Sequence, residues 1–284
     1  MKHILTFDIE DWFHIIDIPG LEDVSTWDKR PSIVEDRTNL ILTILEEFEV
    51  KATFFILGWI AEKYPTLSRK IAESGHEVAS HSYWHRRVYN QSRKEFYQDL
   101  KRSIDVIQNQ TGIKVKGFRA PSFSIVPGTE WAFDIIKEIG LEYDASLFPA
   151  KRAHGGYPCA AGIHMLETSK GSLPELPMSI STFGSMGFPF SGGGYLRLLP
   201  LWVIKNRFKT FERQGLPVVV YLHPRDFAPD QPRVRMPIHR MFKSYVGLTT
   251  TESKLKSLLA DFQFTTCEDA LSSYLETMIE KKKN

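Results

Sequence analysis

Apolar and polar residues alternate along the first 146 positions in a pattern that predicts strands separated by helices. Short apolar runs predict buried strands, and longer segments with apolar residues at helical spacing predict helices. The expected strands cover residues 3–8, 51–57, 76–80, 114–119 and 141–146. The expected helices cover residues 37–48, 58–74 (interrupted at Pro65), 92–111 and 129–140. This order is typical of an α/β fold with a mainly parallel sheet.

The pattern breaks between about residues 149 and 200, where prolines and the run Ser191-Gly192-Gly193-Gly194 replace the helical spacing. Proline and glycine favour turns and loops, so we expect a loop-rich insertion here, near the mouth of a site. The later expected elements are helix 201–215, strand 216–222, an irregular stretch 225–248, helix 249–260, strand 262–265 and a helix from residue 268. Because no internal repeat or low-complexity linker occurs in the sequence, we predict one domain over residues 1–284.

Composition excludes some classes of partner. Lysine and arginine number 36 and aspartate and glutamate 34, so the chain has no basic excess that would indicate a nucleic-acid partner. Only Cys159 and Cys267 are present, which gives no sign of a disulfide framework. The first apolar run reaches Asp8 before a signal-peptide core develops, and no window approaches the roughly 18 apolar residues of a membrane span. We therefore expect a cytoplasmic protein without an integral membrane segment; its oligomeric state stays open.

Chemically reactive side chains fall at the ends of the expected strands. In parallel α/β folds the carboxyl ends of the strands meet at one edge of the sheet, and active sites gather there. The side chains that follow this rule are Asp8, His81, Arg119, Asp144 and His223. Their common placement predicts a single site.

His81 and His85 are four residues apart, a spacing that suits a shared metal ion. If the segment is helical, the two imidazoles are neighbours on one face. A carboxylate from the acidic cluster at residues 8–11 would then complete a catalytic metal site with three protein ligands and an open position. The alternative is a pair of hydrogen-bonded histidines that bind no metal.

These residues belong to five motifs that occur in a fixed order along residues 3–226. The motifs are Thr6-Phe7-Asp8, His81-Ser82-x-x-His85, Arg119-Ala120-Pro121-Ser122-Phe123, Asp144-Ala145-Ser146 and Leu222-His223-Pro224. With them the chain resembles the polysaccharide deacetylase family, also called NodB-homology or carbohydrate esterase family 4. It is most similar to the branch with a Gly-rich insertion that is associated with exopolysaccharide and capsule loci. The resemblance implies a distorted (β/α) barrel and a divalent metal, usually zinc.

The resemblance also implies a role for each motif residue. Asp8 would be the general base, His81 and His85 metal ligands, and His223 the general acid. The residue types suit one reaction: a metal activates water, a carboxylate accepts the water's proton, and a histidine protonates the leaving nitrogen. The expected reaction is hydrolysis of an N-acetyl group on a sugar.

Two further motif residues would support that machinery. The resemblance implies that Arg119 orients Asp8 and keeps it charged, and that Asp144 is a candidate partner for His223. The alternative for Arg119 and Asp144 is a structural salt bridge, with each other or with neighbours.

The acidic cluster departs from the common family pattern, in which the residue after the first aspartate is a second aspartate that binds metal. Here Asp8 is followed by Ile9. Along a strand, Asp8 and Glu10 lie on the same side, whereas Asp11 reaches that side only if the strand has ended and turned. Glu10 is therefore favoured as the third ligand, with Asp11 as its competitor.

Aromatic residues beside the motifs are candidates for stacking on the apolar faces of a sugar, although aromatic residues are more often part of the core. The candidates for substrate binding are Trp12, Trp84 and Phe123. Glu175 and Arg197, in the expected insertion, are further candidates for contacts with the substrate.

We therefore expect a metal-dependent deacetylase that removes an N-acetyl group from a sugar of an acetylated glycan or glycan precursor. One alternative is an amidohydrolase or O-deacetylase of the same fold that acts on another substrate. A second alternative is a catalytically inactive carbohydrate-binding protein, which Ile9 favours because the common ligand is absent there. Asp8, Arg119 and His223 oppose it, because binding alone does not require them.

Overall fold

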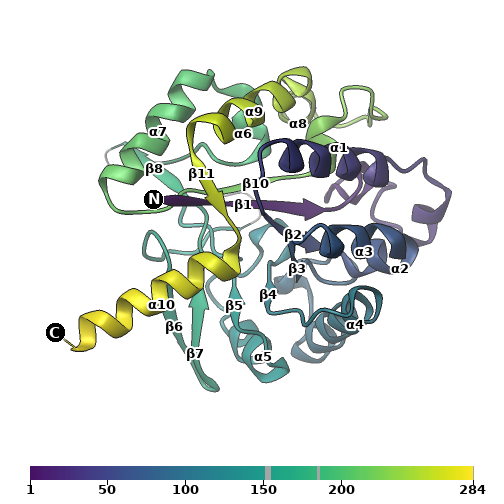
Figure 1. Cartoon of the computed structure of the whole chain (residues 1–284). Helices are drawn as coiled ribbons and strands as arrows, with labels where there is room; N and C mark the ends of the chain where they lie inside the picture. The colour runs from purple at the N-terminus through teal and green to yellow at the C-terminus, as the bar shows by residue number, and fades with distance from the viewer. Residues whose placement is uncertain (151–154, 184–185, 284) are drawn as a thin grey trace.

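The computed structural model describes residues 1–150, 155–183 and 186–283 and contains a nine-stranded sheet (Figure 1). The sheet order is β10-β1-β2-β3-β4-β5-β7-β6, with β11 also paired to β1. These strands are β1 (Lys2–Ile9), β2 (Thr53–Ile56), β3 (Glu77–Ser80), β4 (Gly117–Phe118), β5 (Tyr143–Asp144), β6 (His164–Thr168), β7 (Gly171–Glu175), β10 (Val219–Leu222) and β11 (Gln263–Thr265). All pairs are parallel except β6 with β7. The expected α/β fold is confirmed.

Helices follow most of the strands and surround the sheet (Figure 1). They are α1 (Val34–Glu47), α2 (Gly58–Lys63), α3 (Pro65–Glu73), α4 (Arg93–Thr111), α5 (Trp131–Ile139), α7 (Leu201–Arg213), α9 (Thr251–Asp261) and α10 (Cys267–Lys283). Pro65 occupies the first position of α3 and separates it from α2, as expected from its missing N–H. Within the described chain, no helix combines the length and the apolar composition that a membrane crossing requires.

In the described part of the chain, strand pairing does not close the sheet into the expected barrel. Residues 176–179 cross the gap between β5 and β10 instead. The Leu176 N–H donates to the carbonyl of Asp144 at 2.9 Å, and the Val219 N–H donates to Ser179 Oγ at 2.8 Å. This segment therefore connects the two ends of the parallel sheet through isolated hydrogen bonds.

The stretch 149–200 contains more regular structure than a loop-rich insertion. Strand β7 joins the parallel sheet beside β5, and β6 pairs antiparallel with β7. The same stretch also contributes the two-stranded sheet of β8 (Ile180–Phe183) and β9 (Met186–Pro189) and the short helix α6 (Gly193–Leu198). Residues 151–154 and 184–185 of this stretch lie outside the described residues. The expectation that residues 225–248 are irregular is wrong in part, because Pro237 precedes a helix, α8 (Ile238–Tyr245). The single-domain organisation stays a prediction.

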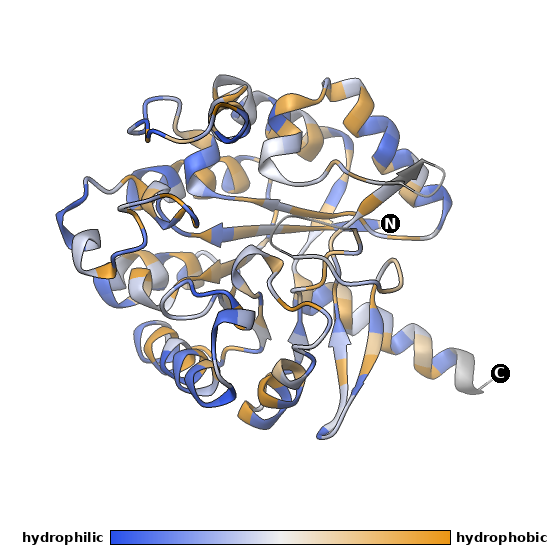
Figure 2. Ribbon diagram, turned by 180° about the vertical axis from the view of Figure 1, so that it is seen from behind, coloured by the Kyte–Doolittle hydropathy of each residue, from blue (hydrophilic) through white to orange (hydrophobic). Residues whose placement is uncertain are grey.

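Strand β1 is an interior strand of the sheet, with β10 along one side and β2 and β11 along the other. Its side chains alternate between two buried clusters: Leu5, Phe7 and Ile9 pack into the larger one, and Ile4 packs into the smaller one. Figure 2 shows apolar residues along these central strands and mixed apolar and polar faces on the surrounding helices. Because strand side chains alternate, Asp8 lies on the same side of the sheet as Ile4, above the smaller cluster.

Candidate metal and catalytic site

Asp8, near the end of β1, forms a buried ion pair with Arg119, the residue that follows β4. Arg119 Nη1 lies 2.8 Å from Asp8 Oδ1, and both side chains are almost fully buried. The same nitrogen donates to Thr6 Oγ1 at 2.7 Å, and Nε donates to the carbonyl of Ala145 at 3.1 Å. Among the described residues, Asp8 is therefore the ion-pair partner of Arg119, and the salt bridge with Asp144 does not form.

Glu10, His81 and His85 form a buried cluster in which their possible ligand atoms all lie within 4.8 Å of one another. His85 Nε2 is 2.7 Å from Glu10 Oε2. Burial would raise the pKa of Glu10, but the charge and hydrogen bond of His85 hold it well below its ordinary range. Burial lowers the pKa of His81 to about 4, so its imidazole is neutral, as a metal ligand must be.

The segment His81–His85 is a turn at the end of β3 and is not helical, so the helical explanation of the spacing is wrong. Ser82 and His85 adopt left-handed backbone conformations with φ of 65° and 55°. Asp99 on α4 stabilises this turn: its carboxylate accepts from the Tyr83 N–H at 2.7 Å and from the next N–H at 3.0 Å. Non-glycine residues in this region are strained and persist where surrounding contacts hold them, which is typical of functional sites.

Asp11, the competitor of Glu10, is used elsewhere. Its carboxylate caps the 3₁₀ turn Trp12–His14, accepting from the Trp12 N–H at 2.8 Å, and it also accepts from Ser32 Oγ and the Ile33 N–H. These bonds satisfy backbone donors that a helix start leaves free. The structure therefore brings Glu10, and not Asp11, to the two histidines.

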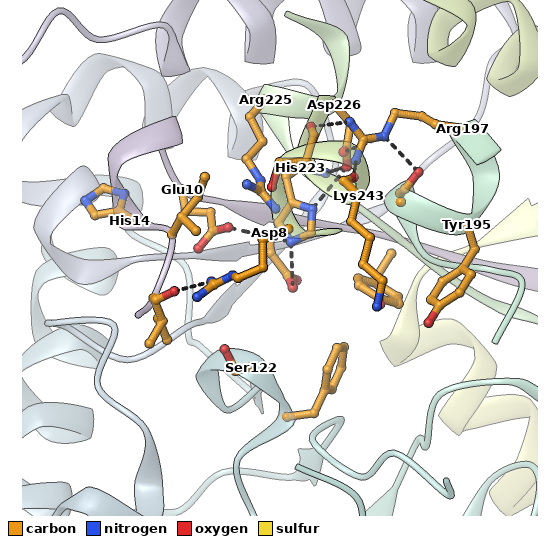
Figure 3. A pocket seen from close by; sticks show the side chains of 18 of the residues that line it. Asp8, Glu10, His14, Ser122, Tyr195, Arg197, His223, Arg225, Asp226 and Lys243 are labelled. Atoms are coloured by element: carbon orange, nitrogen blue, oxygen red, sulfur yellow. Dashed lines mark hydrogen bonds and ion pairs between the residues drawn. The ribbon is translucent and has the colours of Figure 1, made fainter. Parts of the chain in front are cut away.

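His223, which follows β10, has Asp8 and Glu10 on one side and Asp226 on the other (Figure 3). Its Nε2 is 3.8 Å from Asp8 Oδ2 and 3.7 Å from Glu10 Oε1. On the other side, Nδ1 is 3.1 Å from Asp226 Oδ2, and Asp226 also accepts from the His223 backbone N–H at 2.9 Å. Asp226 in turn lies 3.4 Å from the buried Nε of Arg197. The arrangement is a chain from Arg197 through Asp226 to His223.

The charges in this chain set the protonation of His223. Burial alone would lower the pKa of His223, but the hydrogen bond and charge of Asp226, together with the charges of Glu10 and Asp8, raise it above its ordinary value. Burial alone would raise the pKa of Asp226, but the charge of Arg197 and the hydrogen bond of His223 hold it below its ordinary range. His223 is therefore set to carry a proton opposite an ionised Asp226.

The expected partnership of Asp144 with His223 is corrected, because Asp226 takes that place. Asp144 accepts from Ser146 Oγ at 2.6 Å and is paired with Glu175, the last residue of β7. Both carboxyl groups are fully buried and lie outside the lining of the cavity described next. Glu175, expected as a substrate contact, therefore belongs to the interior.

A cavity of about 310 Å³ lies over the site. Its lining includes Asp8, Glu10, His14, His81, His85, Ser122, Phe123, Tyr195, Tyr221 and His223, together with the cationic residues Arg87, Arg197, Arg225, Arg240 and Lys243. Of the expected aromatic contacts, Phe123 lines this cavity, and Trp84 lines a neighbouring one of about 510 Å³ with Trp27. Trp12 lines neither cavity, because it is buried and donates from Nε1 to the carbonyl of Pro31 at 2.8 Å.

The sequence reasoning missed Asp226 and the role of Arg197. An aspartate three residues after His223, with Pro224 at the first helical position, is a capping pattern that predicts a hydrogen-bonded turn. That signal could have placed the Asp226 carboxylate beside His223. Arg197 does line the cavity, as a substrate contact would, but its guanidinium is engaged with Asp226 and backbone carbonyls.

Two family models match the chain. Residues 23–143 match the model described as polysaccharide deacetylase, and residues 145–272 match a domain of unknown function, DUF3473. The first range contains His81, His85 and Arg119, and the second contains His223.

Curated relatives match part of the chain. Over 108 residues the chain is 32% identical to a peptidoglycan-N-acetylglucosamine deacetylase of Bacillus cereus, which covers 38% of this chain and 38% of that protein. Over 174 residues it is 27% identical to the peptidoglycan-N-acetylglucosamine deacetylase PgdA of Listeria monocytogenes, which covers 58% of this chain and 36% of that protein. The matches thus span little more than a third of the length of these relatives.

A solved structure extends the likeness in fold to nearly the whole chain. It belongs to a candidate polysaccharide deacetylase from Mycobacterium smegmatis, with a TM-score of 0.65 and 21% identity over 97% of this chain and 90% of the other. At that identity the likeness shows the fold, here a mixed α/β fold with a parallel sheet.

Proposed function

We propose that the chain is a polysaccharide deacetylase that removes an N-acetyl group from a sugar of a glycan or glycan precursor by metal-assisted hydrolysis, which the match of residues 23–143 to the polysaccharide deacetylase model supports. The observation that carries this proposal is the convergence of three groups on one cavity: the Asp8–Arg119 ion pair, the Glu10 cluster with its two histidines, and His223. The relatives described as peptidoglycan-N-acetylglucosamine deacetylases support an acetylated glycan as the substrate.

A divalent metal, with zinc as our first choice, fits the donor set of Glu10, His81 and His85. Two imidazoles and a carboxylate with an open position are typical of catalytic zinc sites. His81 Nδ1 lies 2.8 Å from the carbonyl of Arg119, a hydrogen bond that leaves the Nε2 lone pair for a metal. When bound there, a divalent ion lowers the pKa of a water molecule and polarises the acetyl carbonyl.

Asp8 is the proposed general base. Arg119 holds its Oδ1, while its Oδ2 faces His223 and Asp8 itself lines the cavity. One carboxylate oxygen is thus fixed and the other is directed to the place where a water molecule would attack the acetyl group. In this position Asp8 accepts a proton from that water.

His223 is the proposed general acid. An amide nitrogen leaves only when it is protonated, and a histidine with a raised pKa holds the required proton near neutral pH. The hydrogen bond from Nδ1 to Asp226 fixes the ring, so that Nε2 is the nitrogen directed at the cavity. Asp226 and Arg197 act as positioning residues through His223.

Acetate release tests this function directly. The zinc-loaded full chain is assayed with N-acetylated oligosaccharides and with O-acetylated xylan as the competing substrate class. We expect Asp8→Asn and His223→Ala each to lower kcat on the N-acetylated substrate by about 10²–10⁴-fold, the usual contribution of a general acid or base, with zinc content unchanged. Acetate from xylan alone would favour an O-deacetylase. Glycan binding without acetate release from any substrate would contradict deacetylation and favour a binding protein. The exopolysaccharide branch and the cytoplasmic location stay predictions.

A further inference from the structure

Cationic side chains outnumber carboxylates around the cavity. Five cations line it, against the three carboxylates of Asp8, Glu10 and Asp226. A divalent metal at the Glu10 cluster would add further positive charge. Since an excess of one sign of charge in a cleft attracts ligands of the opposite sign, the cavity favours an anion.

Three of the five cations are already engaged. Arg197 pairs with Asp226 and donates to backbone carbonyls, and Arg87 pairs with Asp17. Arg240 donates to the backbone carbonyls of Asp17 at 2.8 Å and of its neighbour Ile16 at 2.5 Å. These three contribute charge, but their guanidinium groups hold the protein together.

Arg225 and Lys243 are different. Within the described ranges, neither forms an ion pair, and the Lys243 ammonium makes no hydrogen bond. Arg225 Nε is buried and has no hydrogen-bond partner there. Figure 3 shows both side chains at the same pocket, Arg225 beside His223 and Lys243 reaching toward the side of Tyr195. A buried donor without a partner costs free energy that a ligand can recover.

Hydrogen bonds from Arg197 hold the backbone of Lys243 in place. Arg197 Nη2 donates to the Lys243 carbonyl at 2.9 Å, and Nη1 donates to the next carbonyl, that of Ser244, at 2.8 Å. These bonds tie the end of α8 to the same arginine that pairs with Asp226. The backbone that carries Lys243 and the proton-donor side of the site are therefore held by one buried group.

We infer that Arg225 and Lys243 form a subsite for an anionic group, a carboxylate or a phosphate, carried by the acetylated sugar or by its neighbour in the substrate. Charge-assisted hydrogen bonds from arginine and lysine to such oxygens are short and strong. This inference rests on the proposed function, because it names the substrate class of the same site.

Binding to a chain that does not turn over tests the subsite separately from catalysis. Dissociation constants are measured by calorimetry on the zinc-loaded Asp8→Asn chain with three probes: neutral chitotetraose, a tetrasaccharide that alternates glucuronate with N-acetylglucosamine, and uridine diphosphate N-acetylglucosamine. We expect one anionic probe to bind at least about tenfold tighter than chitotetraose, with an advantage that shrinks as salt rises. Whether the glucuronate or the diphosphate probe has the advantage identifies the source of the anion.

Substitutions of Arg225 and Lys243 test whether these two residues cause the tighter binding of the anionic probe. We expect Lys243→Gln and Arg225→Gln each to reduce it by about threefold to tenfold. Lys209→Gln, which removes an exposed lysine of α7 outside the cavity lining, should leave it unchanged. Lys243 is exposed, so its substitution does not endanger folding.

Two results overturn the subsite: equal or weaker binding of both anionic probes relative to chitotetraose, or an advantage that both variants retain. Acetate release by the wild-type chain is measured in parallel. Selective anion binding without acetate from any probe would contradict the proposed deacetylation and leave the subsite supported.

Discussion

Two buried aspartates beside the same sheet, Asp226 and Asp144, have pKa values that are shifted in opposite directions. Both are at most 1% exposed. Burial alone would raise the pKa of Asp226, but Arg197 and His223 hold it below its ordinary range. Asp144 has Glu175 as its neighbour, and burial raises its pKa to about 6. A cationic neighbour, more than the depth of burial, therefore sets the direction in which the pKa of a carboxyl group shifts inside this protein.

The two aspartates also serve different parts of the molecule. Asp226 lines the cavity and fixes His223. Asp144 accepts from Ser146 Oγ at 2.6 Å, and that hydroxyl accepts from the Ala120 N–H at 2.8 Å. Asp144 thus supports the backbone next to Arg119 and has no contact with the cavity. Asp226, with a lowered pKa, acts on the site, whereas Asp144, with a raised pKa, stabilises a loop.

The largest expected effect concerns the charge that keeps Asp226 ionised. Arg197→Ala leaves the Asp226 carboxylate buried without its cation, which typically costs about 3–5 kcal/mol of stability. Chemical denaturation measures the free energy of unfolding. Lys114→Ala, which breaks the exposed pair with Glu142, is the control and should cost less than about 1 kcal/mol. Equal losses in the two variants would contradict the importance of the buried pair.

The next effect is on catalysis. Asp226→Asn removes the charge that raises the pKa of His223, and we expect kcat for acetate release to fall by about 10–100-fold, the usual cost of losing a partner that orients a catalytic group. The pH profile of kcat should also lose its activity at the alkaline side first, because His223 would release its proton at lower pH. Asp144→Asn is the matched control, with kcat within about threefold of wild type. A larger loss in Asp144→Asn than in Asp226→Asn would reverse the assignment.

The smallest effect is the pH dependence of stability. The folded-state pKa of Asp144 lies at about 6, above its ordinary value of 3.8, so the folded chain binds more protons than the unfolded chain between these values. Stability from this group is therefore present below about pH 4 and is lost as pH rises toward 6. Between about pH 4 and 6, the free energy of unfolding should fall less steeply with pH for Asp144→Asn than for wild type. The two slopes should differ by about 1 kcal/mol per pH unit. Parallel slopes for the two proteins would contradict the raised pKa.

The sequence predicts well which strand ends carry the site, because buried strands appear as apolar runs. Strand β1 is an apolar run that stops at polar residues, so the position of Asp8 at its end follows from the pattern alone. Strand alternation also favours Glu10 over Asp11, and the structure places Glu10 in the cluster. The spacing of His81 and His85 was ambiguous, because a strained turn brings two side chains together as a helix does.

Contacts between residues that are far apart in the sequence could not be predicted from it. Arg197, on α6, meets Asp226, in the turn after β10, because Gly192 just before α6 pairs with Tyr221 of β10. Neither charged residue carries a periodic signal for that pairing. Asp144 ends a strand just as Asp8 does, yet its neighbour across the sheet is Glu175 and not a histidine. The position of a residue at a strand end therefore predicts that it lies at this edge of the sheet, but it does not predict which side chain it contacts.

Metal binding by two acidic variants is the most direct test of the central claim that Glu10, His81 and His85 form the metal centre. Zinc affinity and stoichiometry are measured for wild type, Glu10→Gln and Asp11→Asn, with acetate release from each. We expect one zinc per wild-type chain. Glu10→Gln should lose more zinc affinity than the about 10–100-fold that follows the loss of a residue that only supports a ligand. Asp11→Asn should bind zinc almost as the wild type does, because the Asp11 carboxylate caps a turn. Zinc retained in Glu10→Gln and lost in Asp11→Asn would contradict this metal centre.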